Sequence, residues 1–167
     1  MNIDLGLLIV RLALGPMLIV HGWNKIAGPG GIAGTTRWFD SLGLRPAAVH
    51  ARVAAATEMG AGLFVTLGLL TGLTALAVVG LMVVAMRTDH WGKGYFVFKG
   101  GWEYTLLVAM VVVGLAATGP GERSADAVFH LDFAGTIWAV VAAAGGVLAA
   151  AALLVLSYRP SQTETSG

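Results

Sequence analysis

Residues 59–86 read MGAGLFVTLGLLTGLTALAVVGLMVVAM, which is 28 residues without a charged side chain. A single helix of this length would extend about 42 Å at 1.5 Å per residue, whereas the hydrocarbon core of a bilayer is about 30 Å thick. The excess favours two helices over one tilted span. We place them at about residues 47–70 and 73–88, with a turn near Thr71 and Gly72.

Apolar, uncharged stretches also lie on both sides of this segment, at residues 12–20, 104–121 and from 133 up to Arg159. Charged residues make up 11% of the chain, against roughly 25% in soluble domains, and the mean hydropathy is +0.81. The sequence therefore predicts an all-α, polytopic transmembrane helix bundle. Its five spans are expected at about residues 5–22, 47–70, 73–88, 102–119 and 133–158.

Three further features complete the expected organisation. Residues 32–44, inside a connector at about residues 23–46, suit either a short amphipathic helix at the membrane interface or a loop with anchoring aromatic residues. In the last span, Ala142, Gly146 and Ala150 form a small-residue stripe that fits packing against another helix. The polar tail, residues 160–167, is expected to be disordered.

The distribution of basic residues supports five spans. With five, eight of the ten lysines and arginines fall on one face, and only Arg11 and Arg123 do not. The eight are Lys25, Arg37, Arg45, Arg52, Arg87, Lys93, Lys99 and Arg159. Positive residues mark the cytoplasmic side, so we expect the N-terminus outside and the C-terminus in the cytoplasm. With four spans the bias disappears. The net charge of +1 gives no reason to propose nucleic acid as a partner.

Two ionisable residues fall inside predicted spans, where a charge costs roughly 2.5 to 3.5 kcal/mol. Arg11 lies about a dozen residues before the first connector and Glu58 about a dozen residues after it. Antiparallel helices would then bring both side chains to a similar depth, so we expect an Arg11–Glu58 pair. Such a pair is either a static contact that fixes helix register or part of a site that handles protons or a ligand.

Further ionisable residues gather near the basic face: His21, Arg52, Asp89, His90 and Glu103. Four helices contribute them, so they suit a pocket with convergent polar groups, or interfacial contacts with headgroups and water. Interfacial contact readily explains Arg52 and Asp89. We keep His21, His90 and Glu103 as the stronger candidates for a site.

The sequence identifies no cofactor. The aromatic residues of this face mainly suit anchoring at the headgroup level, and a quinone is a cofactor that the same residues would allow. The chain has no cysteine, and the histidines and carboxylates lack the spacing of a di-metal helix bundle, so no metal site is predicted. Aromatic walls beside a histidine and a carboxylate suit a flat apolar ring that exchanges protons. We expect proton handling by Glu58, His21 and Glu103. The walls of the quinone pocket would be His21, Trp23, His90, Trp102 and Glu103.

Several motifs resemble the DoxX family of small membrane proteins. They are His21-Gly22-Trp23-Asn24-Lys25, the connector from Gly31-Ile32-Ala33-Gly34 to Ser41-Leu42-Gly43-Leu44-Arg45-Pro46, Glu58 followed by small residues, the turn Gly68-Leu69-Leu70-Thr71-Gly72-Leu73, and Lys99-Gly100-Gly101-Trp102-Glu103-Tyr104. Together they cover roughly residues 5–126.

The resemblance implies a four-helix membrane domain over residues 1–126, in a bacterial inner membrane and a redox setting, since the family includes a subunit type linked to thiosulfate:quinone oxidoreductase. The family-like polar residues are His21, Lys25, Glu58, Lys99 and Glu103. The chain departs from the family in an additional helix at residues 127–159 and in an acidic loop with Glu122, Asp126 and Asp132.

Three functions fit the sequence. The first is a membrane subunit of a redox-linked complex, with a quinone bound among His21, Glu58, His90 and Glu103. The second is a noncatalytic anchor that recruits partner proteins through the basic face and the last helix. The third, transport near Arg11 and Glu58, is weakened because five spans show no inverted repeat. Lipid is an expected partner in each case, and other subunits or further copies of the chain are expected too.

Overall fold

The computed structural model describes residues 3–160. Over this range its regular elements are helices, together with one isolated β-bridge between Leu44 and Tyr158. Beyond Pro160, the tail that the sequence predicts to be disordered lies outside the described residues. The α-helices are α1 (Ile3–Ala27), α2 (Gly31–Ser41), α3 (Ala47–Leu67), α4 (Thr71–Ala85), α5 (Glu103–Thr118), α6 (Ala125–Val128), α7 (Thr136–Val140) and α8 (Gly146–Ser157). A π-helical turn, Val141–Gly145, joins α7 to α8, and three short helical turns, Met86–His90, Trp91–Lys93 and Val97–Lys99, lie between α4 and α5.

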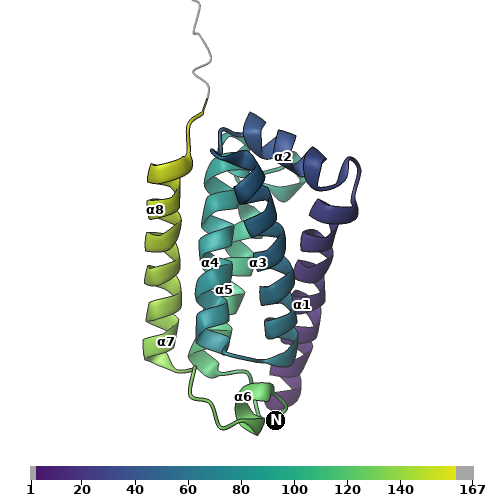
Figure 1. The fold of residues 1–167 in the computed structure, drawn as a ribbon. Coiled ribbons are helices and arrows are strands. Elements are labelled where there is room, and N and C mark those ends of the chain that lie inside the picture. The colour runs from purple at the N-terminus through teal and green to yellow at the C-terminus, as the bar shows by residue number, and fades with distance from the viewer. Residues whose placement is uncertain (1–2, 161–167) are drawn as a thin grey trace, which may run out of the picture.

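Helices α1, α3, α4 and α5 form a bundle, and α7 and α8 make one further rod beside α4 (Figure 1). By length and composition, the helical segments Ile3–Ala27, Thr71–Lys93 and Thr136–Ser157 can each cross a membrane. Helix α5 is shorter but also apolar, and α3 packs along α1. The predicted class, a helical membrane bundle, is therefore confirmed.

The long apolar stretch is divided as predicted, although the turn comes earlier than expected. Helix α3 ends at Leu67 and α4 begins at Thr71. Gly68 has a φ of 65°, the left-handed conformation that commonly ends a helix at glycine. A β-carbon at Gly68 would also lie 2.5 Å from Nη1 of Arg11, so this turn needs glycine for space as well as for conformation.

The two ends of the bundle differ in charge. At the upper end, the top of Figure 1, lie α2, the α4–α5 connector (residues 86–102) and the end of α8. The eight basic residues predicted to share a face belong to these elements or to the adjoining turns of α1 and α3. The lower end holds the start of α1, the α3–α4 turn and the lower connector (residues 119–135), which includes α6 and Arg123.

Helix α2 confirms the helical alternative for the first connector. It lies across the upper end (Figure 1) and buries Phe39 in a small cluster with Leu44, Ala47, Ala51 and Ala54. Two backbone hydrogen bonds fasten the loop after α2 to the end of α8. The amide of Arg45 donates to the Ser157 carbonyl and the amide of Arg159 donates to the Gly43 carbonyl.

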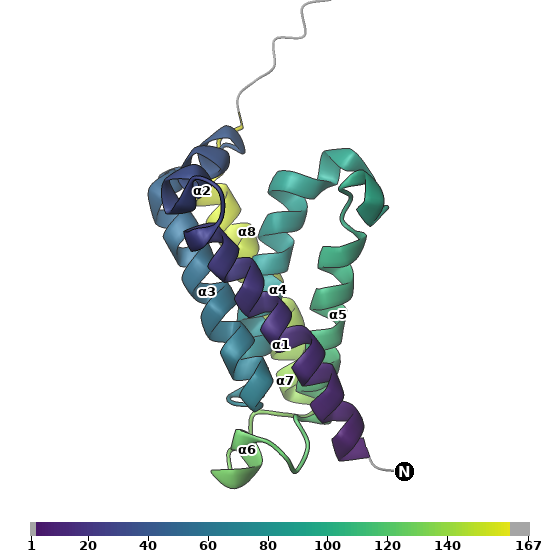
Figure 2. The same cartoon turned by 90° about the vertical axis from the view of Figure 1, so that its right-hand side faces the viewer.

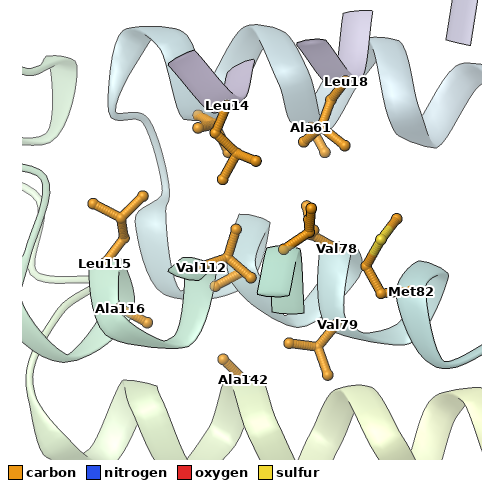
Figure 3. Close-up of a cluster of buried hydrophobic side chains, with 13 residues drawn as sticks. Leu14, Leu18, Ala61, Val78, Val79, Met82, Val112, Leu115, Ala116 and Ala142 are labelled. Atoms are coloured by element: carbon orange, nitrogen blue, oxygen red, sulfur yellow. The ribbon is translucent and has the colours of Figure 1, made fainter. Parts of the chain in front are cut away.

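An apolar core fills the middle of the bundle (Figure 3). Leu14 and Leu18 of α1 face Val78 of α4 and Val112 of α5. The small-residue stripe of the last helix packs on α4 as predicted, because a β-carbon at Gly146 would lie 2.7 Å from the Val79 side chain. In Figure 2, α1 runs diagonally across the bundle and α5 leans away from α3 toward the upper end.

Candidate functional site

Close contact between α1 and α3 determines where their polar side chains meet. A β-carbon on Gly15 would lie 2.6 Å from the Gly62 carbonyl oxygen, and a β-carbon on Gly62 would lie 2.6 Å from the Gly15 carbonyl oxygen. Two turns further up α1, a β-carbon on Gly22 would lie 3.0 Å from Cβ of Glu58. Lys25 follows Gly22 by three residues, so both lie on the face of α1 that meets α3.

A buried ion pair joins the two helices at this level. Nζ of Lys25 lies 2.6 Å from Oε2 of Glu58, and the two side chains are only 14% and 9% exposed. The hydroxyl of Thr35 in α2 donates to the Lys25 carbonyl oxygen at 2.8 Å, which ties α2 to the end of α1. Each charge removed from water here is therefore balanced by the other, as a buried pair requires.

The pair lines a cavity of about 80 Å³ beneath α2, which we call the polar cavity because ionisable side chains border it, although most of its wall is apolar. Four ionisable residues border this cavity: Lys25, Glu58, Asp89 and His90. The rest of its wall is aromatic or mainly aliphatic and includes Trp38, Phe39, Leu81 and Val84. Helices α1 and α3 and the start of the α4–α5 connector thus bring a cation, two carboxylates and an imidazole to one small space.

Hydrogen bonding determines which nitrogen of His90 can exchange a proton. Nδ1 lies 2.7 Å from the Gly100 carbonyl oxygen, which can only accept, so Nδ1 carries a hydrogen. Nε2 is then the basic nitrogen, and it lies 3.6 Å from Oδ2 of Asp89. Asp89 also pairs with Lys93 at 2.8 Å. An imidazole held this way can accept a proton on Nε2 while Asp89 stabilises the resulting charge.

Arg11 lies far from this cavity, so the predicted Arg11–Glu58 pair is wrong. Only 1% of Arg11 is exposed, and its Nη1 and Nη2 donate to the carbonyl oxygens of Thr66 and Arg123 at 3.1 and 2.6 Å. Arg11 thus binds the lower connector to the end of α3. Glu58 takes Lys25 as its partner instead.

Asp126 is the acidic counterpart of Arg11 at the lower end. It is 3% exposed and accepts hydrogen bonds from the backbone amides of Leu70 and Thr71 and from the Thr71 hydroxyl. Its own amide donates to the Gly68 carbonyl oxygen. The carboxylate therefore caps the start of α4 from another segment of the chain, an arrangement suited to a helix N-terminus.

Comparison with known proteins is consistent with this architecture. A family model described as DoxX matches residues 6–91, which span α1, α2, α3, α4 and the start of the α4–α5 connector. The chain belongs to the DoxX family. The matched region supplies all four ionisable residues of the polar cavity.

Two curated DoxX-like relatives are similar over most of the chain. "Inner membrane protein YqjF" of Escherichia coli (strain K12) is 31% identical over 123 residues, which cover 74% of this chain and 91% of the relative. "Putative oxidoreductase CatD" of Bacillus subtilis (strain 168) is 30% identical over 122 residues, which cover 71% and 82%. Among solved structures, no significant match is found. The chain is thus a membrane protein, in agreement with its apolar helices.

The structure brings together only part of the predicted quinone pocket. Of the residues proposed for it, Glu58 and His90 line the polar cavity. His21, in the first DoxX-like motif, is exposed and stacks on Tyr104 with ring centroids 5.9 Å apart. Trp23 is 56% exposed. These two residues of α1 do not border the cavity.

Trp102 and Glu103, in the last DoxX-like motif, organise the α4–α5 connector. Trp102 stacks on Trp91 at 6.1 Å and meets Tyr95 edge-on at 4.8 Å. Glu103 accepts a hydrogen bond from the Val97 amide at 3.0 Å. Both residues thus shape the loop that carries Gly100, the carbonyl partner of His90. Within residues 3–160, no three histidine or acidic side chains are grouped closely enough to hold a metal ion.

Sequence reasoning gave too little weight to three residues of the two polar sites. The sequence predicts Lys25 as a residue of the basic face and as a family-like residue, but not as the partner of Glu58, although its position three residues after Gly22 places it on the α1 face that packs on α3. Asp89 was assigned to the interface. Asp126 is expected only as part of the acidic loop that departs from the family, because nothing in the neighbouring sequence indicates that it caps a distant helix.

Proposed function

We propose that this DoxX protein is the membrane-embedded subunit of a redox-linked complex and binds a lipophilic quinone beside the polar cavity. One observation carries the proposal. The buried Lys25–Glu58 pair shares a cavity with Asp89 and with His90, whose Nε2 is the basic nitrogen. Ionisable groups buried inside a membrane protein are costly, and they commonly serve transport of protons or binding of polar ligand groups.

These groups suit the proton chemistry of a quinone. Reduction to a hydroquinone takes up two electrons and two protons, the electrons coming from a redox partner protein. Nζ of Lys25 can donate a hydrogen bond to a quinone carbonyl oxygen, and Glu58 and His90 can exchange protons with it. Asp89 connects His90 to Lys93 at the upper surface, so protons can be replenished from the adjoining water.

The size of the cavity limits how such a ring could enter. A cavity of about 150 Å³ is known to hold benzene, about twice the space available here. We therefore place only the carbonyl edge of the ring in the cavity. Trp38 lines the cavity and is 43% exposed, so rotation of its indole would widen the entrance.

The name of one relative supports the same direction. CatD is named "Putative oxidoreductase", and we extend that class to this chain as part of the proposal. The basic upper end is proposed to face the cytoplasm, since positive residues favour that side. A redox partner would then dock there, on α2 and the α4–α5 connector. Residues 1–126 are proposed to form the family domain, and residues 127–159 to add a helix to it.

A noncatalytic anchor is the second candidate, because the outer face of α7 and α8 is apolar and open. Ile137, Leu148, Val155 and Leu156 are 69 to 78% exposed. Lipid can cover this face, and so can a helix of a partner subunit or of a second copy of the chain.

Retention of quinone by the purified protein tests the first proposal. The protein would be extracted gently from membranes and its bound quinone quantified for wild type, Glu58→Gln and Lys25→Met. Glu122→Gln serves as the control, since Glu122 is exposed in the lower connector, at the end of the bundle opposite the cavity. We expect wild type and the control to retain quinone and the two cavity variants to lose most of it. Equal retention by all four proteins would reject the site.

The same preparations test the anchor. If no protein retains quinone, but a stoichiometric partner copurifies and is lost when residues 133–167 are deleted, the anchoring role is favoured. In that case Glu58→Gln and Lys25→Met should leave the partner bound.

A further inference from the structure

An apolar groove runs along the outside of the bundle between α3, α4 and α8. Its upper part has a volume of about 260 Å³, and residues lining it include Leu44, Val53, Leu76 and Leu153. A second part, also of about 260 Å³, continues toward Leu70 at the lower end. The two parts share Thr57 and Ala77 as lining residues, so they form one continuous surface, which we call the lipid-side groove.

Small side chains explain why the groove stays open. Ala54, Thr57 and Gly60 of α3 and Ala77 and Gly80 of α4 line it. Helix α8 approaches α4 closely, since a β-carbon on Gly80 would lie 3.4 Å from the Gly146 carbonyl oxygen. It therefore packs against α4 and leaves this strip between itself and α3 uncovered. An unfilled apolar groove forfeits dispersion contacts, so a chain of matching shape is favoured to occupy it.

The groove has the length of a lipid chain. From Leu70 to Val84 along α4 it extends about 21 Å at 1.5 Å per residue. Half of a bilayer's hydrocarbon core measures about 15 Å. One acyl chain from the upper leaflet can thus lie entirely within the groove.

Basic side chains surround the upper mouth of the groove. Arg87 follows Val84, a lining residue, by three positions, and its guanidinium lies 5.3 Å from the centre of the Tyr158 ring. Arg159 comes directly after Tyr158 and donates to the carbonyl oxygens of Val155 and Tyr158. Within residues 3–160, neither arginine has a carboxylate within 4.0 Å.

Two other groups border the same mouth. His50 lines the groove, and its Nε2 lies 3.2 Å from the Arg45 carbonyl oxygen. Arg45 is paired with Asp40 and is held near Arg159 by the hydrogen bonds between the α2–α3 loop and the end of α8. The charge that remains unbalanced at the mouth is therefore positive and comes from Arg87 and Arg159.

We propose that the lipid-side groove binds one anionic phospholipid, with an acyl chain along α3 and α4 and the phosphate at Arg87 and Arg159. Basic pockets between transmembrane helices on the cytoplasmic side are a recurrent way of holding anionic headgroups. Arginine suits a phosphate because its guanidinium can donate two parallel hydrogen bonds. The bound lipid would fill the space between α3 and α8 and so join the additional helix to the family domain. This site does not depend on the quinone proposal.

Lipid selectivity tests the site directly. The protein would be reconstituted in quinone-free vesicles of equal parts phosphatidylglycerol and phosphatidylcholine, extracted, and examined by native mass spectrometry. We expect wild type to keep about one phospholipid per chain, with phosphatidylglycerol favoured several-fold. Combining Arg87→Gln with Arg159→Gln should bring the ratio near one. Lys99→Gln, which removes a positive charge from the same end but away from the groove, should leave the ratio unchanged.

A second arm of the experiment fills the groove with a larger side chain. Ala77→Phe places a ring where the two parts of the groove meet and should abolish retention of either lipid. Ala117→Phe makes the same enlargement at an exposed position of α5, away from the groove, and should retain lipid as wild type does. Circular dichroism checks that each variant is folded.

Three outcomes would overturn the proposal: an equal lipid ratio in wild type, an unchanged ratio in the double arginine variant, or full retention by Ala77→Phe. If a variant fails to fold, the ratio of phosphatidylglycerol to phosphatidylcholine retained by wild type alone decides whether the groove selects an anionic lipid. Because the vesicles contain no quinone, such a failure leaves the quinone proposal standing.

Discussion

Nζ of Lys25 lies 2.6 Å from Oε2 of Glu58, and both side chains are largely buried between α1 and α3. A buried ion pair gains little over a well-packed apolar pair, because desolvation offsets most of the attraction. Loss of one partner is different, since it leaves an unbalanced charge in a poorly solvated place. Because of this asymmetry, the coupling energy of the pair can be measured by comparing single and double variants.

We predict strong coupling between Lys25 and Glu58. Lys25→Met and Glu58→Gln should each destabilise the protein by about 3 kcal/mol, whereas the double variant should be clearly more stable than the sum of the two losses implies. Unfolding by a denaturing detergent, followed by circular dichroism, measures all four proteins. Simple additivity would show that the two side chains do not stabilise each other.

A second prediction concerns two glycines of α3 that lie two residues apart. A β-carbon at Gly62 would lie 2.6 Å from the Gly15 carbonyl oxygen and 2.8 Å from Ile19, whereas one at Gly60 would meet nothing within 4 Å. Gly62→Ala should therefore cost about 1 to 3 kcal/mol through separation of α1 and α3. Gly60→Ala should be neutral or stabilise by up to about 1 kcal/mol. The same unfolding assay compares them, and equal effects would contradict this close packing.

The sequence was sufficient for the features that depend on length and composition. The split of the long apolar stretch followed from comparing 28 residues with a bilayer's thickness, and α3 and α4 confirm it. That the last helix packs against another helix followed from its small-residue stripe, and the structure shows that this neighbour is α4. Both inferences use properties of a single segment, so they need no knowledge of how helices are rotated or offset.

The Arg11–Glu58 pairing failed because it required the offset between two helices. Counting from the connector placed Arg11 and Glu58 at one level, but α1 continues to Ala27, which shifts its residues relative to α3. Arg11 instead meets Thr66, eight residues or about 12 Å further along α3 than Glu58. Lys25 comes to the level of Glu58 for the same reason.

The third prediction concerns the cap that Asp126 provides for α4. Asp126→Asn replaces one carboxylate oxygen with an amide group that cannot accept from the donors of Leu70 or Thr71, so a loss of about 1 to 3 kcal/mol is expected. Thr71→Val removes one of the three bonds and should cost about 1 kcal/mol. Asp132→Asn, at an exposed position of the same connector, is the control and should behave as wild type. Faster proteolysis of the lower connector in Asp126→Asn would accompany the loss, and unchanged stability would exclude the capping role.

The last prediction tests the orientation of the chain, for which the absence of cysteine is an advantage. Lys99→Cys places a thiol in the α4–α5 connector at the basic upper end, and Glu122→Cys places one in the lower connector; both positions are exposed. Because positive residues favour the cytoplasmic side, a membrane-impermeant maleimide added to intact cells should label only Glu122→Cys. Permeabilised cells should show labelling of both variants, which controls for accessibility. The reverse pattern in intact cells would place the polar cavity at the outer surface, so that Glu58 and His90 would exchange protons with the exterior and a cytoplasmic redox partner could not dock on α2.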